Sequence, residues 1–315
     1  MTLGVVIPYF QRTPGLLARA VRSALDQTGL ETLLIVVVDD GSPHPAKLEL
    51  GTFSEAERRN IVLIEQSNAG VSAARNRALD AMPDRINAIA FLDPDDAWHP
   101  GHLENANIAL DSGADFYFAD FTRPGVKQTR FERSNIQFDQ HVSIDIGTNL
   151  YKYNKKFRRD LIQETIVGTS TVVLPRRSLG SARFRTDLTA SEDLLTWFCT
   201  TTERSQVIFS SRCEAEYGEG VGLIAKSVWG TKRSLRVALD QSIMLKIVSE
   251  DAEIDDELRS WIALSRRDCR MNFVRTMLHR LRRLQPVDFD ATRRFVKFDP
   301  EISVDLFRAL VGRSE

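Results

Sequence analysis

The chain has 315 residues, 43% of them hydrophobic and 27% charged, which is ordinary for a globular protein of one large or two modest domains. Its 42 Lys and Arg nearly balance its 43 Asp and Glu, so no bulk charge draws it to nucleic acid. Three scattered cysteines argue against a disulfide scaffold, and no apolar run reaches the ~18 residues of a membrane span, so we expect a cytoplasmic protein that binds no nucleic acid.

The first 120 residues alternate short apolar runs with helical patterns. Strands are predicted at residues 3–8, 33–38, 61–64, 88–92 and 115–119. Helices are predicted between them, the first capped by Thr13 ahead of Pro14 and two others over 70–82 and 102–110. This alternation indicates right-handed crossovers and a mostly parallel sheet in an α/β fold.

The rest of the chain is less regular and then becomes helical. Residues 121–165 are polar with a basic run, and short strands are predicted at 169–174 and 207–209. A helix capped near Ser191 follows the loop from residue 187. Helices are predicted over 235–249, 258–284 and from Pro300 onwards. The change in pattern places a domain boundary between residues 225 and 226.

An acidic cluster ends the fourth predicted strand, in the stretch FLDPDDAWHP (91–100). Two carboxylates about 4 Å apart repel by roughly 4 kcal/mol at an effective dielectric near 20, so three in four residues favour a positive partner such as Mg²⁺ or Mn²⁺. A helix cap is the alternative for Asp96, but it accounts for one carboxylate only. A calcium EF-hand fails because Trp98 stands where the turn needs glycine.

A second acidic pair, Asp39 and Asp40, ends the second strand in VVVDDGS (36–42). Its Asp-Gly-Ser sequence is also typical of an ordinary turn after a strand. Ligands bind at the carboxyl ends of strands in such sheets, so both acidic clusters face one crevice if strands two and four flank the first strand.

Two further motifs each allow a functional and a structural interpretation. Arg75 and Arg77 in NAGVSAARNRAL (68–79) are either solvated or able to offer a planar fork to phosphate. The acids of SED (191–193) either favour the start of a helix or supply Asp193 as a general base.

Taken in order, VVIPYFQR (5–12), VVVDDGS, NAGVSAARNRAL, FLDPDDAWHP and SED resemble the family 2 glycosyltransferases, which have the GT-A fold. The motifs cover the first ~200 residues, and within the family the chain is most similar to glucosyltransferases that build succinoglycan-type exopolysaccharides on a lipid carrier. The resemblance implies a nucleotide-sugar-binding and catalytic domain over 1–225 and a helical C-terminal region over 226–315.

The resemblance also implies a role for individual residues. Five would hold the nucleotide: Pro8 and Tyr9 at the base, Asp39 at the uracil or ribose, Arg75 at the nucleotide and Asp93 at the ribose. Asp95 would bind Mg²⁺ or Mn²⁺, and Asp193 would deprotonate the acceptor hydroxyl. The expected donor is a UDP-sugar and the expected acceptor a saccharide, lipid-linked by analogy. Direct displacement would invert the anomeric carbon.

One departure from the family concerns processivity. Its processive members carry a QxxRW-type motif after the base, and neither Trp229 nor Trp261 fits that pattern here. We therefore expect transfer of a single sugar rather than polymer extrusion.

A basic stretch runs from residue 258 to 297, with eleven Lys or Arg against three acids. Apolar residues recur in it at helical spacing: Leu258, Ile262, Phe273, Met277, Leu281 and Leu284. This amphipathic helix either packs on the catalytic domain with a solvated basic face or docks on an anionic membrane surface, at the inner face of the cell membrane.

Other functions remain as alternatives. A sugar-nucleotide pyrophosphorylase needs a glycine-rich loop after strand one, where PYFQRTPG has one glycine, and a receiver domain has its acidic pair after strand one, not strand two. A catalytically silent nucleotide-sugar or saccharide-binding protein of the same fold, and a transferase acting on lipopolysaccharide or capsule, are both compatible with the motifs.

Overall fold

The computed structural model describes residues 1–144, 149–219 and 228–310. The chain divides into two units: unit 1 contains Met1–Thr186 and Thr196–Gly220, and unit 2 contains Asp187–Leu195 and Val221–Glu315. The short segment Asp187–Leu195 therefore belongs to unit 2 although both flanking segments belong to unit 1. The predicted boundary between residues 225 and 226 lies outside the described residues.

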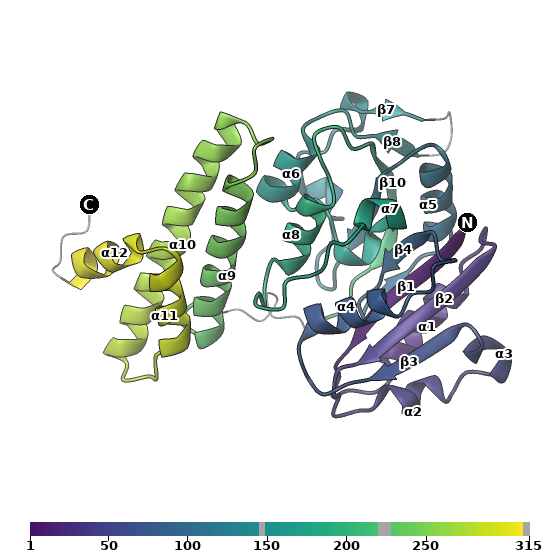
Figure 1. Cartoon of the computed structure of the whole chain (residues 1–315), viewed down its shortest axis with the longest axis horizontal. Coiled ribbons are helices and arrows are strands. Elements are labelled where there is room, and N and C mark those ends of the chain that lie inside the picture. The colour runs from purple at the N-terminus through teal and green to yellow at the C-terminus, as the bar shows by residue number, and fades with distance from the viewer. Residues whose placement is uncertain (145–148, 220–227, 311–315) are drawn as a thin grey trace. The chain divides into compact units, whose positions relative to one another are not determined.

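Unit 1 is built on one sheet. Its strands are β1 (Thr2–Tyr9), β2 (Thr32–Asp39), β3 (Ile61–Glu65), β4 (Ala88–Phe91), β5 (Ala97–Trp98), β6 (Phe116–Thr122), β7 (Val142–Ser143), β8 (Leu150–Lys152), β9 (Val173–Pro175) and β10 (Val207–Glu216). They lie in the order β3-β2-β1-β4-β9-β6-β10-β8-β7, with β5 paired to β10. Figure 1 labels β1, β2, β3 and β4 among them. The strands β1 to β4 are parallel, and β9 is antiparallel to both β4 and β6.

Helices lie between these strands in the sequence. The longer ones are α1 (Leu16–Leu25), α4 (Val71–Asp80), α5 (His102–Asp111), α6 (Phe157–Glu164) and α8 (Glu192–Cys199). The shorter ones are α2 (Ala46–Leu50), α3 (Glu55–Arg58) and α7 (Arg176–Leu179), with 3-10 turns η1 (Phe131–Arg133), η2 (Phe138–Gln140) and η3 (Thr169–Thr171).

The sheet is covered on both faces because apolar side chains point to both sides of its central strands. On one face, Ile7 of β1 shares a core cluster with Ala20 of α1 and Leu103 of α5. On the other face, Phe91 of β4 packs edge-on against Trp197 of α8, with ring centroids 4.9 Å apart. The continuous apolar run of β2 is buried from Leu34 onwards, as predicted for a strand covered on both sides.

Three sequence predictions for unit 1 are wrong. The strand predicted at 169–174 is a 3-10 turn over Thr169–Thr171 followed by the short strand Val173–Pro175. The first helix begins at Leu16 after Gly15, whose φ of 92° suits glycine, so Thr13 is not its cap. Residues 121–165 are not simply irregular, because they include β7, β8 and α6. The basic residues obscured the helical pattern of α6 in the sequence. Arg158 of this helix is buried and lies over the Phe198 ring at 3.7 Å instead of in water.

The strand predicted at 207–209 extends to Glu216 as β10. Polar residues such as Ser210 and Glu214 interrupt its apolar pattern, and its pairing with β6 shifts register twice. Glu214 is nevertheless buried, because Tyr117 and Asn105 donate hydrogen bonds to its carboxylate at 2.6 and 2.5 Å. A partner distant in sequence therefore lets a charged residue continue a buried strand.

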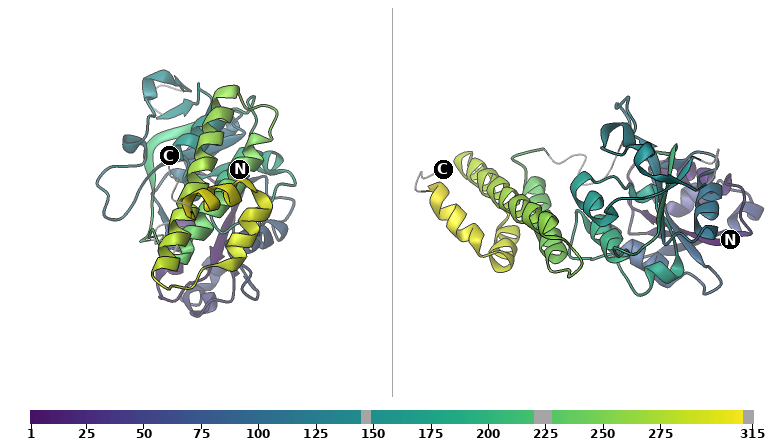
Figure 2. Two further views of the ribbon diagram at one scale, coloured as in Figure 1. Left: turned by 90° about the vertical axis from the view of Figure 1, so that its left-hand side faces the viewer. Right: turned by 90° about the horizontal axis from the view of Figure 1, so that it is seen from above.

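The C-terminal part of unit 2 is helical, with α9 (Lys232–Ser249), α10 (Asp256–Arg282), α11 (Phe289–Phe298) and α12 (Glu301–Leu310). α9 packs along α10, and α11 and α12 pack against that pair (Figure 2). The helices predicted over 235–249 and 258–284 are confirmed. α11 was not predicted, although Asp288 caps it by accepting a hydrogen bond from Ala291 N–H at 3.1 Å.

The basic stretch is less uniform than its sequence indicated. Arg270 is buried, and its guanidinium binds Asp299 and Asp305 at 3.0 Å each. Leu258, Ile262, Phe273 and Met277 are buried as predicted. Leu281 and Leu284, predicted on the same apolar face, are instead 48% and 95% exposed.

Candidate active site

The carboxyl ends of β2, β1 and β4 lie side by side. β1 is hydrogen-bonded to β2 on one side and to β4 on the other, all three parallel, with Tyr9 opposite Asp39 and Val6 opposite Phe91. The acidic residues that follow β2 and β4 therefore emerge at one edge of the sheet. The prediction that strands two and four flank the first strand is confirmed.

At this edge the two aspartates at the end of β2 are buried and accept hydrogen bonds from backbone amides. Asp39 accepts hydrogen bonds from the N–H groups of Ser42 and Ala46, each at 2.8 Å and each on a different carboxylate oxygen. Asp40 accepts from Ala69 N–H and Gly70 N–H, both at 2.8 Å. Asp40 thereby fixes the loop that starts α4, and Asp39 fixes its own DGS turn.

Asp93 has a positive partner within the chain. The guanidinium of buried Arg75 donates from Nη2 to Oδ1 of Asp93 at 2.8 Å and lies over the Phe184 ring at 5.2 Å. Arg75 comes from the helix after β3 and Asp93 from the loop after β4. The structure thus brings together two predicted nucleotide ligands from separate motifs, and one of the three clustered carboxylates is neutralised before any ligand binds.

Asp96 has a structural role that the sequence did not reveal. It is buried, its Oδ2 accepts from Ser170 Oγ at 2.5 Å, and its Oδ1 accepts from Gly218 N–H at 2.8 Å. Burial first, and then the charges of Asp93 and Asp95, raise the pKa of Asp96 well above its usual range. It does not cap the next helix, because α5 begins at His102 after Gly101.

Asp95 is half-buried and its loop is held from two sides. Arg19 donates to the Asp95 carbonyl oxygen at 2.6 Å. Gly218 packs so closely that a Cβ there would lie 2.3 Å from the same oxygen. The backbone of the predicted metal ligand is therefore tightly positioned by residues far from it in the sequence.

The donor set fits a divalent cation that takes part of its coordination shell from a substrate. Asp95 supplies hard carboxylate oxygens of the kind that Mg²⁺ and Mn²⁺ prefer. Among the described residues, no three or more His, Cys, Asp or Glu side chains are placed to hold a metal ion. Mg²⁺ is commonly bound in this way, through one or two carboxylates, phosphate oxygens and water.

The residues at the end of β1 divide between core and surface. Pro8 is buried, and Tyr9 is only 1% exposed, with its hydroxyl donating to Glu49 Oε1 at 3.1 Å. Burial and the Glu49 charge raise the pKa of Tyr9. Phe10, the residue after β1, is 41% exposed at the same strand end, and no sequence motif singled it out. Strand alternation could not have revealed it, because alternation would place Phe10 on the same face as buried Pro8.

Asp193 lies in unit 2, in the first turn of α8. Its Oδ1 accepts a hydrogen bond from Leu194 N–H at 2.8 Å, and α8 begins at Glu192 after Ser191, whose φ is 62°. Asp39, Arg75 and Asp93 lie in unit 1, and the catalytic role of Asp193 stays a prediction.

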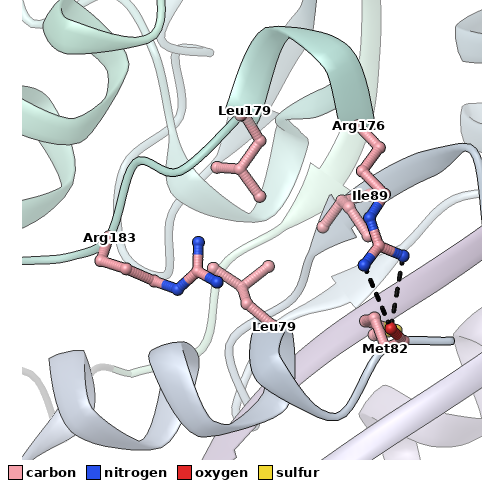
Figure 3. Close-up of a pocket in the computed structure, with 7 residues that line it drawn as sticks. Leu79, Met82, Ile89, Arg176, Leu179 and Arg183 are labelled. Carbon is pink, nitrogen blue, oxygen red and sulfur yellow. Dashed lines mark hydrogen bonds between the residues drawn. The ribbon is translucent and has the colours of Figure 1, made fainter. Parts of the chain in front are cut away.

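A small cavity beside the start of β4 is not the active site. Leu79, Met82, Ile89, Arg176, Leu179 and Arg183 line it (Figure 3). Arg176 donates to the Met82 and Pro83 carbonyl oxygens, and Arg183 pairs with Asp80 at 2.7 Å. The cavity volume of about 40 Å³ suits water rather than a sugar.

Residues 4–180 match the model of glycosyl transferase family 2, which is more than half of the chain. The chain belongs to this family. None of the helices in the described ranges combines the length and apolar composition of a membrane span.

Several curated proteins are similar to this glycosyltransferase. The succinoglycan biosynthesis protein ExoW of Rhizobium meliloti (strain 1021) is 28% identical over 99% of this chain and 98% of its own length. The putative teichuronic acid biosynthesis glycosyltransferase TuaG of Bacillus subtilis (strain 168) is 26% identical over 66% of this chain and 76% of its own.

Solved structures share the fold. Residues 1–349 of S. aureus TarS superpose with a TM-score of 0.60 at 17% identity, over 97% of this chain and 83% of that one. The mannosyltransferase PcManGT from Pyrobaculum calidifontis gives 0.58 at 14% identity, over 99% and 86%. The predicted family, GT-A fold with a helical C-terminal region and glycosyltransferase activity are thereby confirmed.

Proposed function

We propose that this glycosyltransferase moves one sugar, expected to be glucose, from a UDP-sugar to a saccharide acceptor during the synthesis of a cell-surface or exported polysaccharide. The observation that carries the proposal is the shared strand edge at which Asp39, Arg75 and Asp93 converge. The names of the succinoglycan and teichuronic acid relatives support the polysaccharide, and a TarS structure in complex with UDP-GlcNAc supports a uridine donor.

The nucleotide would bind along this edge. Asp39 uses one lone pair of each carboxylate oxygen in the backbone hydrogen bonds, and a carboxylate oxygen can accept a second, here from the uracil or a ribose hydroxyl. Asp93 would accept from the ribose while Arg75 neutralises it. The exposed ring of Phe10, next in the chain to buried Pro8 and Tyr9, offers the base a stacking surface.

Asp95 would hold Mg²⁺ or Mn²⁺ together with the diphosphate. When bound, such a cation stabilises the negative charge that develops on a departing diphosphate. PcManGT was solved in complex with GDP-Man and Mn²⁺, which supports the cation.

The transfer itself is a direct displacement. Asp193 accepts the proton of an acceptor hydroxyl, and the hydroxyl oxygen forms a bond to the anomeric carbon as the bond from that carbon to the diphosphate oxygen breaks. UDP leaves with the bonding electron pair, and attack opposite to the leaving group inverts the anomeric carbon. A lipid-linked acceptor would bring the enzyme to the inner face of the cell membrane; a lipopolysaccharide or capsule acceptor is the second candidate.

The donor half of the proposal is tested by Asp95→Ala. Calorimetry with UDP and Mn²⁺ should show wild-type binding that depends on the metal and a variant in which that dependence is lost. The exposed Asp84 provides a matched control, since Asp84→Ala removes an acidic side chain that lies outside the motif. Unchanged affinity and metal dependence in Asp95→Ala would contradict the assignment.

The chemical half is tested by Asp193→Asn in a screen of UDP-sugars for transfer and hydrolysis. The amide keeps the size of the side chain but cannot take a proton, so transfer should fall by roughly 10²–10⁴-fold while UDP affinity stays the same. A wild-type protein that binds UDP-sugars but never transfers them would instead indicate the silent binding protein.

A further inference from the structure

The turn between α10 and α11 exposes large apolar side chains next to arginines. Leu284 is 95% exposed and Phe289 is 79% exposed. Arg282 and Arg283 are also exposed. We define the turn surface as Leu281, Arg282, Arg283, Leu284, Phe289 and Arg293. Isolated exposed apolar residues are normal in proteins, but three within nine residues at one helix–helix turn are a patch that needs a reason.

Leu284 is exposed in an unfavourable backbone conformation. Its φ of 52° is left-handed, a region that disfavours residues with a Cβ and in which helix ends commonly use glycine. A leucine there gains no burial in return. Leu284 therefore keeps an unfavourable backbone conformation without a compensating contact in unit 2. This combination is expected of a functional residue.

Hydrogen bonds of buried residues fix the backbone beneath the turn surface. Buried Arg280 donates from Nε and Nη2 to the Pro286 carbonyl oxygen at 3.1 and 2.8 Å, and from Nη1 to the Gly230 carbonyl oxygen at 2.9 Å. Asp288 caps α11 and binds Arg236 at 2.9 Å. The apolar side chains are therefore presented outward by an ordered turn.

The exposed face of α11 continues the same chemistry. Phe289, Arg293, Val296 and Lys297 are spaced i, i+4, i+7 and i+8, so they share one side of the helix, and all four are exposed. The buried Phe295 lies on the other side. Between residues 281 and 297 the sequence has five basic and two acidic residues, and one of these acids, Asp288, is already paired with Arg236.

We propose that the turn surface docks on an anionic lipid bilayer, with Leu284 and Phe289 entering the boundary between headgroups and acyl chains and the arginines contacting lipid phosphates. Alternating apolar and cationic side chains are the composition of interfacial membrane segments. The positive charge selects an anionic surface. The docking does not depend on the sugar or on the metal, although it agrees with a lipid-linked acceptor.

The experiment is sedimentation of the full-length protein with vesicles of phosphatidylcholine alone and with 30% phosphatidylglycerol added, at low salt. Leu284→Gly removes the apolar side chain and suits the left-handed backbone, so it should fold at least as well as the wild type. Arg282→Gln with Arg283→Gln should weaken binding by roughly 30-fold, from about fivefold for each arginine near an anionic surface.

Matched controls distinguish docking through the turn surface from nonspecific binding through any exposed apolar or basic side chain. Leu264 is another exposed leucine of α10, and Arg58 with Arg59 is another exposed adjacent arginine pair. The proposal expects wild type, Leu264→Gln and the Arg58→Gln, Arg59→Gln variant to bind anionic vesicles equally, while Leu284→Gly and Arg282→Gln with Arg283→Gln lose binding.

Three results would overturn the proposal: no wild-type binding to anionic vesicles, equal loss in the control variants, or self-association in light scattering that Leu284→Gly abolishes, which would assign the turn to a second copy. Transfer to a soluble acceptor is measured in parallel without lipid. If the protein does not bind vesicles but still transfers the sugar, the docking proposal fails and the proposed function stands. If it binds vesicles but transfers no sugar, the proposed function fails and the docking proposal stands.

Discussion

Gly218 shows how closely the loop that carries Asp95 is packed. A Cβ at this position would lie 2.3 Å from the Asp95 carbonyl oxygen and 2.8 Å from its Cβ, so one of the two backbones must move. Gly218→Ala should therefore destabilise the protein by about 1–3 kcal/mol and weaken metal-dependent UDP binding, because Asp95 is displaced. Urea unfolding and calorimetry measure the two effects.

Gly51→Ala is the control for this substitution. Gly51 follows α2 with an ordinary φ of −64°, and its Cβ would approach nothing nearer than the Lys47 carbonyl oxygen at 3.2 Å. It should leave UDP binding unchanged. If Gly218→Ala binds UDP as well as the Gly51→Ala control does, then Gly218 does not position Asp95.

At the scale of residues, the sequence was enough to find the acidic residues at the strand ends, but not to tell apart their structural roles. Each of Asp40, Asp93 and Asp96 follows a buried strand, and pattern alone treats them alike. Their partners separate them: Asp40 holds backbone amides, Asp93 pairs with Arg75, and Asp96 binds Ser170 and Gly218. These partners lie up to 122 residues away, so no local spacing could reveal them.

His141, next to the edge strand β7, gives this part of the sheet a pH dependence. It is buried against the Tyr153 ring at 4.5 Å, and Asn154 N–H donates to its Nδ1 at 3.1 Å. Burial first, and then the Lys155 charge, lower the pKa of His141 below its usual value of about 6.5. The unfolded chain is therefore protonated before the folded one as the pH falls.

The resulting stability is fully present above about pH 6.5 and is lost as the pH falls from there through the folded pKa. His141→Gln keeps an acceptor for Asn154 but does not titrate, so its free energy of unfolding should decline less than that of the wild type between pH 7.5 and 5. Each unit of pKa shift contributes up to about 1.4 kcal/mol. The exposed His99 serves as control, and an equal effect of His99→Gln would remove the explanation.

At the scale of elements, the sequence predicted those strands and helices that have a continuous or periodic apolar pattern. The strands β1 to β4 and the helices α4, α5, α9 and α10 follow such patterns. α6 and the second half of β10 did not, because charged residues inside them are buried by distant partners, Phe198 for Arg158 and Tyr117 for Glu214. Those tertiary contacts outweigh local polarity.

At the scale of the whole molecule, the division into units separates the predicted catalytic residues along the chain. The nucleotide-binding group lies in unit 1, whereas Asp193 lies on Asp187–Leu195, which unit 2 holds. Within unit 2, buried Asp240 of α9 accepts from Thr189 N–H at 2.8 Å and from Thr189 Oγ1 at 2.7 Å. The position of the proposed base therefore depends on a helix outside the residues that match the family model.

Asp240→Ala tests this dependence. The change removes the acceptor of both hydrogen bonds that Thr189 donates; at about 0.5–1.5 kcal/mol for each bond, this should cost about 1–3 kcal/mol of stability and loosen the segment that carries Asp193. A misplaced base slows transfer by up to roughly 10²-fold, so kcat should fall while the Kd for UDP, set by unit 1, stays constant. Asp268→Ala, on the exposed side of α10, is the control and should change neither quantity. A parallel loss of UDP affinity would show that Asp240 supports the fold as a whole rather than the position of the base.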